Sequence, residues 1–544
     1  MHNDIAVYIV VSKNLANMMS SVTVGLKMQY DVIVIGAGSA GSAAASRLSE
    51  DPNRSILLLE AGPDYPDIAH LPDELKYGYS TGTDIMVSDE HNWQFKGKGN
   101  EHTPEMLVPR GKVTGGTSAI NGQIFLRGLT HDFDDWANNG NDEWTYEKVL
   151  PFFRNLETDM DFSDDFHGKD GPIICRRFKR EDWLPSQEAF FQSCRNAGFP
   201  EVEDFNQPDS AGVGAFPNNN PNGIRFSSAI GYLTPARYRL NLTIRSKCFV
   251  RKLLFKNKKF YGVEVESAGD IFTVEGKEAI LSSGTIANAQ ILLLSGIGPT
   301  QELEELGIET IHNLPGVGKN FSDHPLIFIT CGVKDGVELD GLAPRLQVGL
   351  RYTAEGSTRE HDMMIWMTSF ATERVNRGGE RMEPIGIRIT CSVYLADSKG
   401  EIKLLSSDPR DHPFLDFHLL EDPEDLRRMR ESVRKAVDIF NDPAFSDMVS
   451  GRIEPLDHDL KNDDSLNRWL QREVTTGQHL TGTCKMGPKT DPMAVVDQNL
   501  KIHGLEGIRV ADASIMPDTV RANTNVTTMM IGERVANFIS TDSA

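Results

Sequence analysis

Residues Tyr30–Gly41 read YDVIVIGAGSAG, and this stretch decides the fold. Its first part, Asp31–Ile35, is apolar and rich in β-branched residues, which is typical of a strand buried in a parallel sheet. A glycine-rich turn then leads into Ser42–Leu48, a helix of small residues that can pack close to a sheet. A second buried strand, Ser55–Leu59, follows and ends at Glu60. Strand, turn, helix, strand and acid within about 30 residues predict one βαβ unit that binds a dinucleotide.

The three glycines of the turn have separate roles in such a unit. Gly36 permits the tight turn, Gly38 lets backbone N–H groups approach a pyrophosphate, and Gly41 lets the helix pack on the strand. The helix N-terminus then faces the anion with its partial positive charge. Glu60, 19 residues after Gly41, is placed to hold ribose hydroxyls. NAD and FAD fit this unit equally well.

A second glycine-rich block favours FAD over NAD. It runs from Pro109 to Asn121 and reads PRGKVTGGTSAIN. Its cations, amides and hydroxyls suit a long anionic ligand, and FAD must be held along its whole extended length. The residues that offer these groups are Arg110, Lys112, Gly115, Gly116, Thr117, Ser118 and Asn121.

Composition argues against nucleic acid and anionic lipid as partners. The chain has 56 Lys plus Arg against 78 Asp plus Glu, a formal charge of −22, which repels phosphate groups.

The length of the chain, 544 residues, predicts two or three packed units. The six cysteines contain no CxxC pair, which indicates free thiols in a reducing compartment, and we expect a cytoplasmic protein. No apolar run approaches the length of a membrane span.

The rest of the chain predicts a second unit that covers the first. Residues 325–475 contain strand-like segments such as Ile387–Tyr394 and a charged helix, Pro423–Asn441, without a phosphate-binding loop. We expect Met1–Lys27 to be an extension without chemistry, and either Met1 or Met28 to be the start.

Several further motifs resemble one family, the glucose–methanol–choline (GMC) oxidoreductases. The matching segments, in family order, are LLLEAG at Leu57–Gly62, PRGKVTGGTSAINGQIFLRG at Pro109–Gly128, DFDDWANNGNDEWTYEKVLPFF at Asp132–Phe153, GTIANAQILLLSGIGP at Gly284–Pro299, LPGVGKNFSDHP at Leu314–Pro325, HLTGTCKMG at His479–Gly487, DPMAVVD at Asp491–Asp497, GLEGIRVADASIMP at Gly504–Pro517 and NTNVTTMMIGERVANFI at Asn523–Ile539. The resemblance covers essentially all of the chain from Met28 to Ile539.

The resemblance implies an α/β fold with two parts. A Rossmann-like FAD-binding domain with a mixed sheet would span 28–324, with inserted cap or lid segments at about 65–105 and 150–225. An α+β substrate domain built on an antiparallel sheet would span 325–475. Residues 476–544 would return to the FAD-binding domain and carry the catalytic residues.

The resemblance also implies a reaction, the oxidation of an alcohol by hydride transfer to flavin N5. His479 matches the catalytic histidine that removes the alcohol proton, and Asn525 is predicted to occupy the second catalytic position, His or Asn in the family. An amide there donates a hydrogen bond to the developing alkoxide. O₂, a quinone or another carrier would reoxidise the flavin. The alternatives are a flavin-dependent lyase or a fatty-acid photodecarboxylase of the same family, and a protein that uses FAD only structurally.

The predicted flavin contacts follow from the same motifs, and we expect no metal site. They are Gly36, Gly38, Ser39, Ala40, Gly41, Glu60, Ala61, Trp93, Arg110, Val113, Gly115, Gly116, Thr117, Ser118, Asn121, Gly122, Ile124, Val250, Gly284, Asp512, Ala513, Asn523, Asn525 and Val526. Some relatives attach FAD covalently through a histidine at the place of Ile120, so we expect a non-covalent cofactor here. Of the other histidines, His324 and His503 lie in turn-like segments that indicate structural roles.

Overall fold

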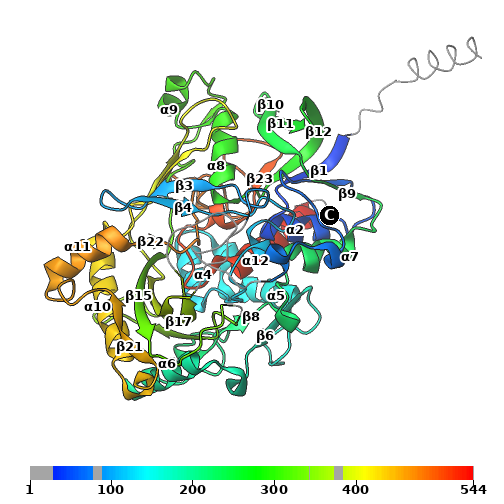
Figure 1. Cartoon of the computed structure of the whole chain (residues 1–544). Helices are drawn as coiled ribbons and strands as arrows, with labels where there is room; N and C mark the ends of the chain where they lie inside the picture. The colour runs from blue at the N-terminus through cyan, green and yellow to red at the C-terminus, as the bar shows by residue number, and fades with distance from the viewer. Residues whose placement is uncertain (1–28, 78–87, 342, 373–383, 543–544) are drawn as a thin grey trace, which may run out of the picture.

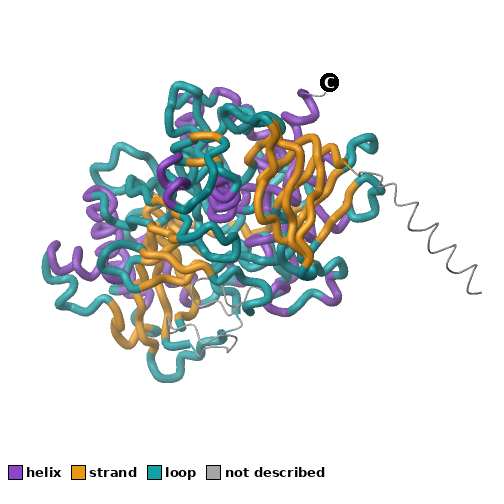
Figure 2. Tube along the Cα trace, turned by 90° about the horizontal axis from the view of Figure 1, so that it is seen from above, coloured by secondary structure: helices purple, strands orange, loops and turns teal. Residues whose placement is uncertain are grey.

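The computed structural model describes residues 29–77, 88–341, 343–372 and 384–542 (Figure 1). The predicted N-terminal extension, both candidate start residues and part of the predicted segment 65–105 lie outside these ranges. Within them, the chain forms two large sheets of seven strands each. Figure 2 shows these two groups of strands set apart, with helices and loops between them.

The first sheet contains the predicted βαβ unit. Its strands are β1 (Gln29–Ile35), β2 (Ile56–Leu59), β9 (Leu242–Arg245), β10 (Phe249–Lys256), β11 (Lys259–Ser267), β12 (Asp270–Leu281) and β23 (Ile508–Val510). The strand order is β10-β11-β12-β1-β2-β9, with β23 also paired to β12. β1 pairs in parallel with β2 and with β12, whereas β10, β11 and the first half of β12 are antiparallel. The sheet is therefore mixed, as predicted.

Two helices cover this sheet and meet each other closely. Helix α2 (Ser39–Leu48) follows the glycine turn, and α12 (Thr524–Asp542) comes from the C-terminus. A Cβ on Gly532 of α12 would lie 2.4 Å from the carbonyl oxygen of Ala40, so only glycine permits this approach. The contact brings the start of α12 to the glycine turn, although about 480 residues separate the two in sequence.

The second sheet is antiparallel and belongs mainly to the predicted substrate domain. Its strands are β7 (Gly212–Ala215), β15 (Pro325–Val333), β16 (Val348–Tyr352), β17 (Met363–Ala371), β18 (Gly386–Val393), β21 (Val449–Glu454) and β22 (Thr475–Thr476). β7 comes from the predicted insertion 150–225. We propose the division at residue 325, which is supported by the start of β15 at Pro325.

The faces of the second sheet differ because side chains alternate along a strand. On β15, Ile327 and Ile329 belong to a core cluster, whereas Leu326 and Phe328 face a cavity on the other side. That core cluster lies against three helices, α6 (Pro185–Asn196), α10 (Pro423–Phe440) and α11 (Asp463–Glu473). In Figure 1, α10 and α11 lie at the outer edge of the molecule, so the opposite face of the sheet is the one turned inwards.

Smaller elements complete the chain. They are α3 (Asp73–Lys76), α4 (Thr130–Asn138), α5 (Tyr146–Leu156), α7 (Thr234–Ala236), α8 (Gly284–Leu294), α9 (Thr300–Glu305), β3 (Phe95–Lys98), β4 (Glu105–Val108), β5 (Glu157–Asp159), β6 (Ile173–Arg177), β8 (Pro217–Asn218), β13 (Ile297–Gly298), β14 (His312–Asn313), β19 (Glu401–Lys403) and β20 (Phe414–Asp416). Within the described ranges, no helix is both long enough and apolar enough to cross a membrane.

Candidate active site

A cavity of about 470 Å³ lies between the two large sheets. Its lining includes Val250 of the first sheet, and His479 and Asn523 from the C-terminal part of the chain. Residues of both glycine-rich blocks also belong to the lining. The volume falls within the range of small-molecule and cofactor sites.

The structure brings most of the predicted flavin contacts to this wall. Those that line the cavity are Gly36, Gly38, Ser39, Ala40, Glu60, Ala61, Trp93, Arg110, Gly116, Thr117, Asn121, Gly122, Ile124, Val250, Gly284, Asp512, Ala513, Asn523 and Asn525. Five others, Gly41, Val113, Gly115, Ser118 and Val526, are not among the lining residues. One of them, Ser118, is buried and donates a hydrogen bond from Oγ to the carbonyl oxygen of Gly115 at 2.6 Å within the second glycine-rich block.

The glycine turn leaves bare backbone at the start of α2. Gly36 has φ +95°, a left-handed conformation that favours glycine, and a Cβ there would lie 2.6 Å from the Ser282 carbonyl oxygen. Gly38 is the residue before α2, and no side chain caps the helix. Its N-terminal N–H groups are therefore available to an anion such as a pyrophosphate.

Glu60, directly after β2, connects this strand to the glycine turn by hydrogen bonds. Its carboxylate accepts hydrogen bonds from the backbone N–H groups of Ala37 and Gly62, each at 2.9 Å. Burial raises its pKa to about 7, although these backbone donors oppose the shift. The side chain also lines the cavity, so a ribose contact would add to these two bonds.

The second sheet supplies the opposite wall. Its residues along the cavity are Leu326, Phe328, Trp366, Thr368, Arg388 and Thr390, and the segment before β16 adds Arg345 and Leu346. This wall combines apolar and polar side chains, which is the usual composition of a substrate pocket.

The pairing of β22 with β15 places His479 at the cavity. Thr476 of β22 lies opposite Pro325 of β15, so the segment after Thr476 runs beside the segment before Pro325. A Cβ on Gly477 would lie 2.5 Å from the carbonyl oxygen of His324, and glycine permits this approach. Gln478 follows with φ +65°, and this turn directs the chain so that His479 lines the cavity.

Both ring nitrogens of His479 have a polar neighbour. Nε2 accepts a hydrogen bond from Nδ2 of Asn523 at 2.9 Å, and Nδ1 lies 3.0 Å from Nδ1 of His324. Burial and the Arg110 cation lower the pKa of His479 from 6.5 to about 3. The ring is therefore neutral at physiological pH, as a general base must be.

The residue beside His479 is Asn523, whereas the sequence prediction gave this place to Asn525. Oδ1 of Asn525 instead accepts a hydrogen bond from Oγ of Ser39 at 2.7 Å, at the glycine turn. Helix α12 begins at Thr524, between the two asparagines. The first asparagine lies before the helix and the second in its first turn, so their side chains reach different parts of the cavity.

Asp323 fixes the backbone at His479 and His324 through hydrogen bonds. Its Oδ1 accepts the N–H groups of His479 and His324, both at 2.8 Å, and Thr476 Oγ1 donates to Oδ2. Burial raises the pKa of Asp323 to about 6, while these donors and Arg110 oppose the rise. The sequence analysis did not identify Asp323 or the contact of His324, although both lie in the quoted SDHP motif.

Two buried donors at the cavity indicate a missing ligand. Nη2 of Arg110 and Nδ2 of Asn525 are buried and form no hydrogen bond with any described residue. Such groups are costly without a partner. A long ligand that carries phosphates and carbonyl groups would satisfy both, and the bare backbone at Gly38 and Gly116 leaves room for it. The residues therefore fit FAD.

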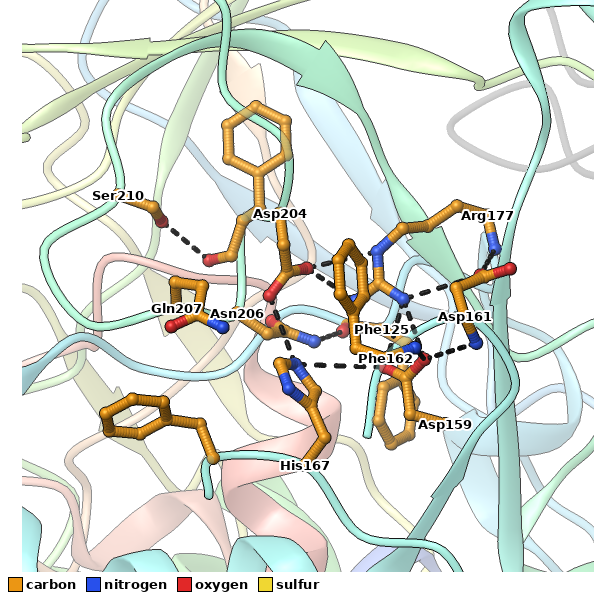
Figure 3. Close-up of polar contacts among 12 residues, drawn as sticks. Phe125, Asp159, Asp161, Phe162, His167, Arg177, Asp204, Asn206, Gln207 and Ser210 are labelled. Atoms are coloured by element: carbon orange, nitrogen blue, oxygen red, sulfur yellow. Dashed lines mark hydrogen bonds and ion pairs between the residues drawn. The ribbon is translucent and has the colours of Figure 1, made fainter. Parts of the chain in front are cut away.

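A second cluster of ionisable groups does not line this cavity, and Figure 3 shows its Asp159, His167 and Arg177. Glu157, Asp159 and His167 are buried and close enough to hold a metal ion. However, Arg127 pairs with Glu157, and Arg177 donates to Asp159 at 2.9 Å. Because these arginines already neutralise the carboxylates, we interpret the cluster as a structural network that joins β5 and β6.

Known proteins match this chain over nearly its whole length. Sequence models of the GMC oxidoreductase family match residues 30–326 and 396–532. An oxygen-dependent choline dehydrogenase of Rhizobium rhizogenes is 34% identical over 539 residues, covering 94% of this chain and 96% of that protein. The protein of the same name from Photobacterium profundum is 32% identical, covering 94% and 93%.

Two solved structures have a similar fold over nearly the whole chain. Pyridoxine 4-oxidase from Mesorbium loti has a TM-score of 0.85 and 25% identity, covering 94% of this chain and 99% of that one. A formate oxidase has the same TM-score and identity, covering 94% and 98%. This chain belongs to the GMC oxidoreductase family. It is an FAD-dependent oxidoreductase that acts on CH–OH groups, as the sequence predicted.

Proposed function

We propose that this enzyme oxidises a small alcohol with His479 as the base and Asn523 as its partner. The observation that carries this assignment is the neutral ring of His479 at the cavity wall, with Nε2 hydrogen-bonded to Asn523 at 2.9 Å. The lining that contains this pair also contains residues of the second sheet. An alcohol there would contact both the base and the substrate wall.

Each residue then has a defined task. When the alcohol binds, its hydroxyl replaces the Asn523 amide as the donor to His479 Nε2, and the alcohol oxygen lies beside Asn523 Nδ2. The hydroxyl proton then moves to Nε2. The Asn523 amide donates a hydrogen bond to the developing alkoxide. FAD, when bound, supplies the acceptor of the hydride that leaves the alcohol carbon. We assign Asn525 and Ser39 to holding the cofactor at the start of α2, which is supported by their mutual hydrogen bond.

We also propose non-covalent FAD. Ile120 lines the cavity at the place where some relatives carry the tethering histidine, and its side chain cannot form that bond.

All six cysteines are free and buried, which supports a reducing compartment such as the cytoplasm. O₂ is the first acceptor to test, because the curated relatives are named oxygen-dependent choline dehydrogenases.

The test is anaerobic bleaching of the flavin by a panel of alcohols in the dark. Choline and pyridoxine belong in the panel because similar proteins carry those names, together with sugars, aromatic and aliphatic alcohols. We expect at least one alcohol to reduce the flavin, and O₂ or a quinone to reoxidise it. A flavin that no alcohol reduces would contradict the proposal and favour the lyase or photodecarboxylase alternative.

A further inference from the structure

His324 lies directly behind His479, far from it in sequence. The two residues are 155 positions apart, and their Nδ1 atoms are separated by 3.0 Å. His324 is fully buried just before β15, whereas His479 lines the cavity. Their rings meet edge to face, with centroids 5.0 Å apart and an interplanar angle of 69°. This geometry is that of a hydrogen bond between two imidazoles.

The distance restricts the hydrogen positions. Two nitrogens at 3.0 Å share one hydrogen, so one Nδ1 donates and the other accepts. Which of the two Nδ1 atoms donates follows from the proposed function. A base that faces the alcohol must have Nε2 unprotonated, so neutral His479 carries its hydrogen on Nδ1. His324 consequently accepts on Nδ1 and carries its own hydrogen on Nε2.

The surroundings of both rings support this arrangement. Tyr394 Oη is 3.4 Å from Oδ1 of Asn523, which orients the amide so that Nδ2 donates to His479. Nε2 of His324 is buried and forms no direct hydrogen bond with a described residue, so nothing among these residues competes with His479 for the His324 ring. Burial and the neighbouring His479 hold the pKa of His324 well below its usual range, so it is a neutral acceptor.

Tyr394 joins the two sides of this network. Its ring stacks on His324 with centroids 4.2 Å apart and an interplanar angle of 10°. Its hydroxyl meets Asn523. Tyr394 thus contacts the partners of both His479 nitrogens, and the three side chains surround the base without adding a negative charge to it.

We propose that His324 is a positioning residue that fixes the tautomer and ring plane of His479 by accepting its Nδ1 hydrogen. When the alcohol proton reaches Nε2, the Nδ1–H bond to His324 persists, so the ring does not rotate during the step. A carboxylate in this place would favour the imidazolium before the reaction. A neutral imidazole orients the base without favouring the imidazolium, so Nε2 is still unprotonated when the alcohol arrives.

The test compares His324→Leu and His324→Asn with wild type and His503→Leu. His503 is a matched control, because its Nε2 donates a hydrogen bond to the carbonyl oxygen of Gly487 at 3.0 Å, away from His479. We expect His324→Leu to slow flavin reduction by about 10- to 100-fold, the usual cost of removing a partner that orients a histidine. Flavin content and alcohol dissociation constant should stay near the wild-type values.

Two readouts separate positioning from a merely structural role. The solvent isotope effect on flavin reduction should rise in His324→Leu, because proton transfer to a misoriented base becomes limiting. His324→Asn, whose amide oxygen can accept from Nδ1–H, should recover part of the rate. An unchanged rate and isotope effect in His324→Leu, with His479→Ala slow, would overturn the proposal and leave the proposed function standing.

If His324→Leu does not fold, Tyr394→Phe and His324→Asn decide the question. Tyr394→Phe keeps the stacking ring and removes the hydroxyl beside Asn523. We expect both variants to slow flavin reduction with a raised solvent isotope effect, and normal behaviour of both would overturn the proposal. If His479→Ala itself reduces flavin at the wild-type rate, the proposed function fails first.

Discussion

Asn523 donates a hydrogen bond from Nδ2 to Nε2 of His479 at 2.9 Å, whereas Asn525, two residues later, meets Ser39 at the glycine turn. On the proposed function, Asn523 therefore takes part in the reaction and Asn525 in cofactor binding. Asn523→Ala should slow flavin reduction by about 10²–10³-fold with FAD retained, because a donor to the developing alkoxide is lost. Asn525→Ala should lower FAD affinity while the flavin that remains bound is reduced at a near-normal rate. The reverse result in anaerobic stopped flow and FAD titration would restore Asn525 as the catalytic partner.

Loss of the base itself should have a larger effect. His479→Ala should keep the yellow cofactor and slow flavin reduction by about 10²–10⁴-fold, the usual contribution of a general base. The measurement is the anaerobic reduction rate constant with the best alcohol of the panel. A near-normal rate in this variant would remove His479 from the mechanism.

Two glycines of the turn should respond differently to the same substitution. A Cβ on Gly41 would lie 1.9 Å from the carbonyl oxygen of Gly36, so Gly41→Ala should destabilise the apoprotein by about 1–3 kcal/mol or more. A Cβ on Gly38 has no neighbour nearer than 3.9 Å, at the edge of the cavity. Gly38→Ala should therefore leave the apoprotein stable and weaken FAD binding.

Thermal unfolding of both apoproteins and FAD titration check the pair. Equal loss of stability in the two variants would contradict the close approach of Gly41 to Gly36. Wild-type FAD affinity in Gly38→Ala would show that the cofactor does not run over this backbone.

The stability of the protein should depend on pH through His479. Its pKa is about 3 in the folded protein and 6.5 in an unfolded chain, so unfolding takes up a proton between these values. The stability that the neutral ring contributes is present above pH 6.5 and is lost as pH falls toward 3. Between pH 8 and 5 this loss is about 2 kcal/mol.

Comparison with His479→Gln isolates this effect. The raised pKa values of Glu60 and Asp323 act in the opposite direction, since their stabilisation is lost as pH rises, but both proteins share them. Wild type should lose more unfolding free energy than His479→Gln between pH 8 and 5, measured with saturating FAD. Equal losses would show that the histidine is not held neutral by burial.

The cofactor should leave the protein on denaturation. Because Ile120 stands where some relatives have the tethering histidine, acid precipitation should release all of the flavin into the supernatant. The absorbance of supernatant and pellet gives the distribution. Flavin that remains with the pellet after washing would reveal attachment through another residue.

The local patterns of the sequence were sufficient for the first sheet and its cofactor. The DVIVI run, three glycines and an acid 19 residues later lie within one short segment, and neighbouring residues determine such a unit. The strand β1, helix α2 and strand β2 were accordingly predicted to within a few residues. The family motifs likewise identified FAD and alcohol oxidation, and they predicted the base at His479, which lines the cavity.

Tertiary structure decided the partners of that histidine. His324 meets His479 only because β22 pairs with β15 in one register, and Asn523 rather than Asn525 meets it because α12 begins between them. The close contact of α12 with α2 at Gly532 then takes Asn525 to Ser39. These contacts depend on how distant elements pack, and composition or spacing along the chain carries no information on that packing. The family motif was thus sufficient to propose His479 as the base, whereas the side chains that orient its ring follow from the tertiary packing.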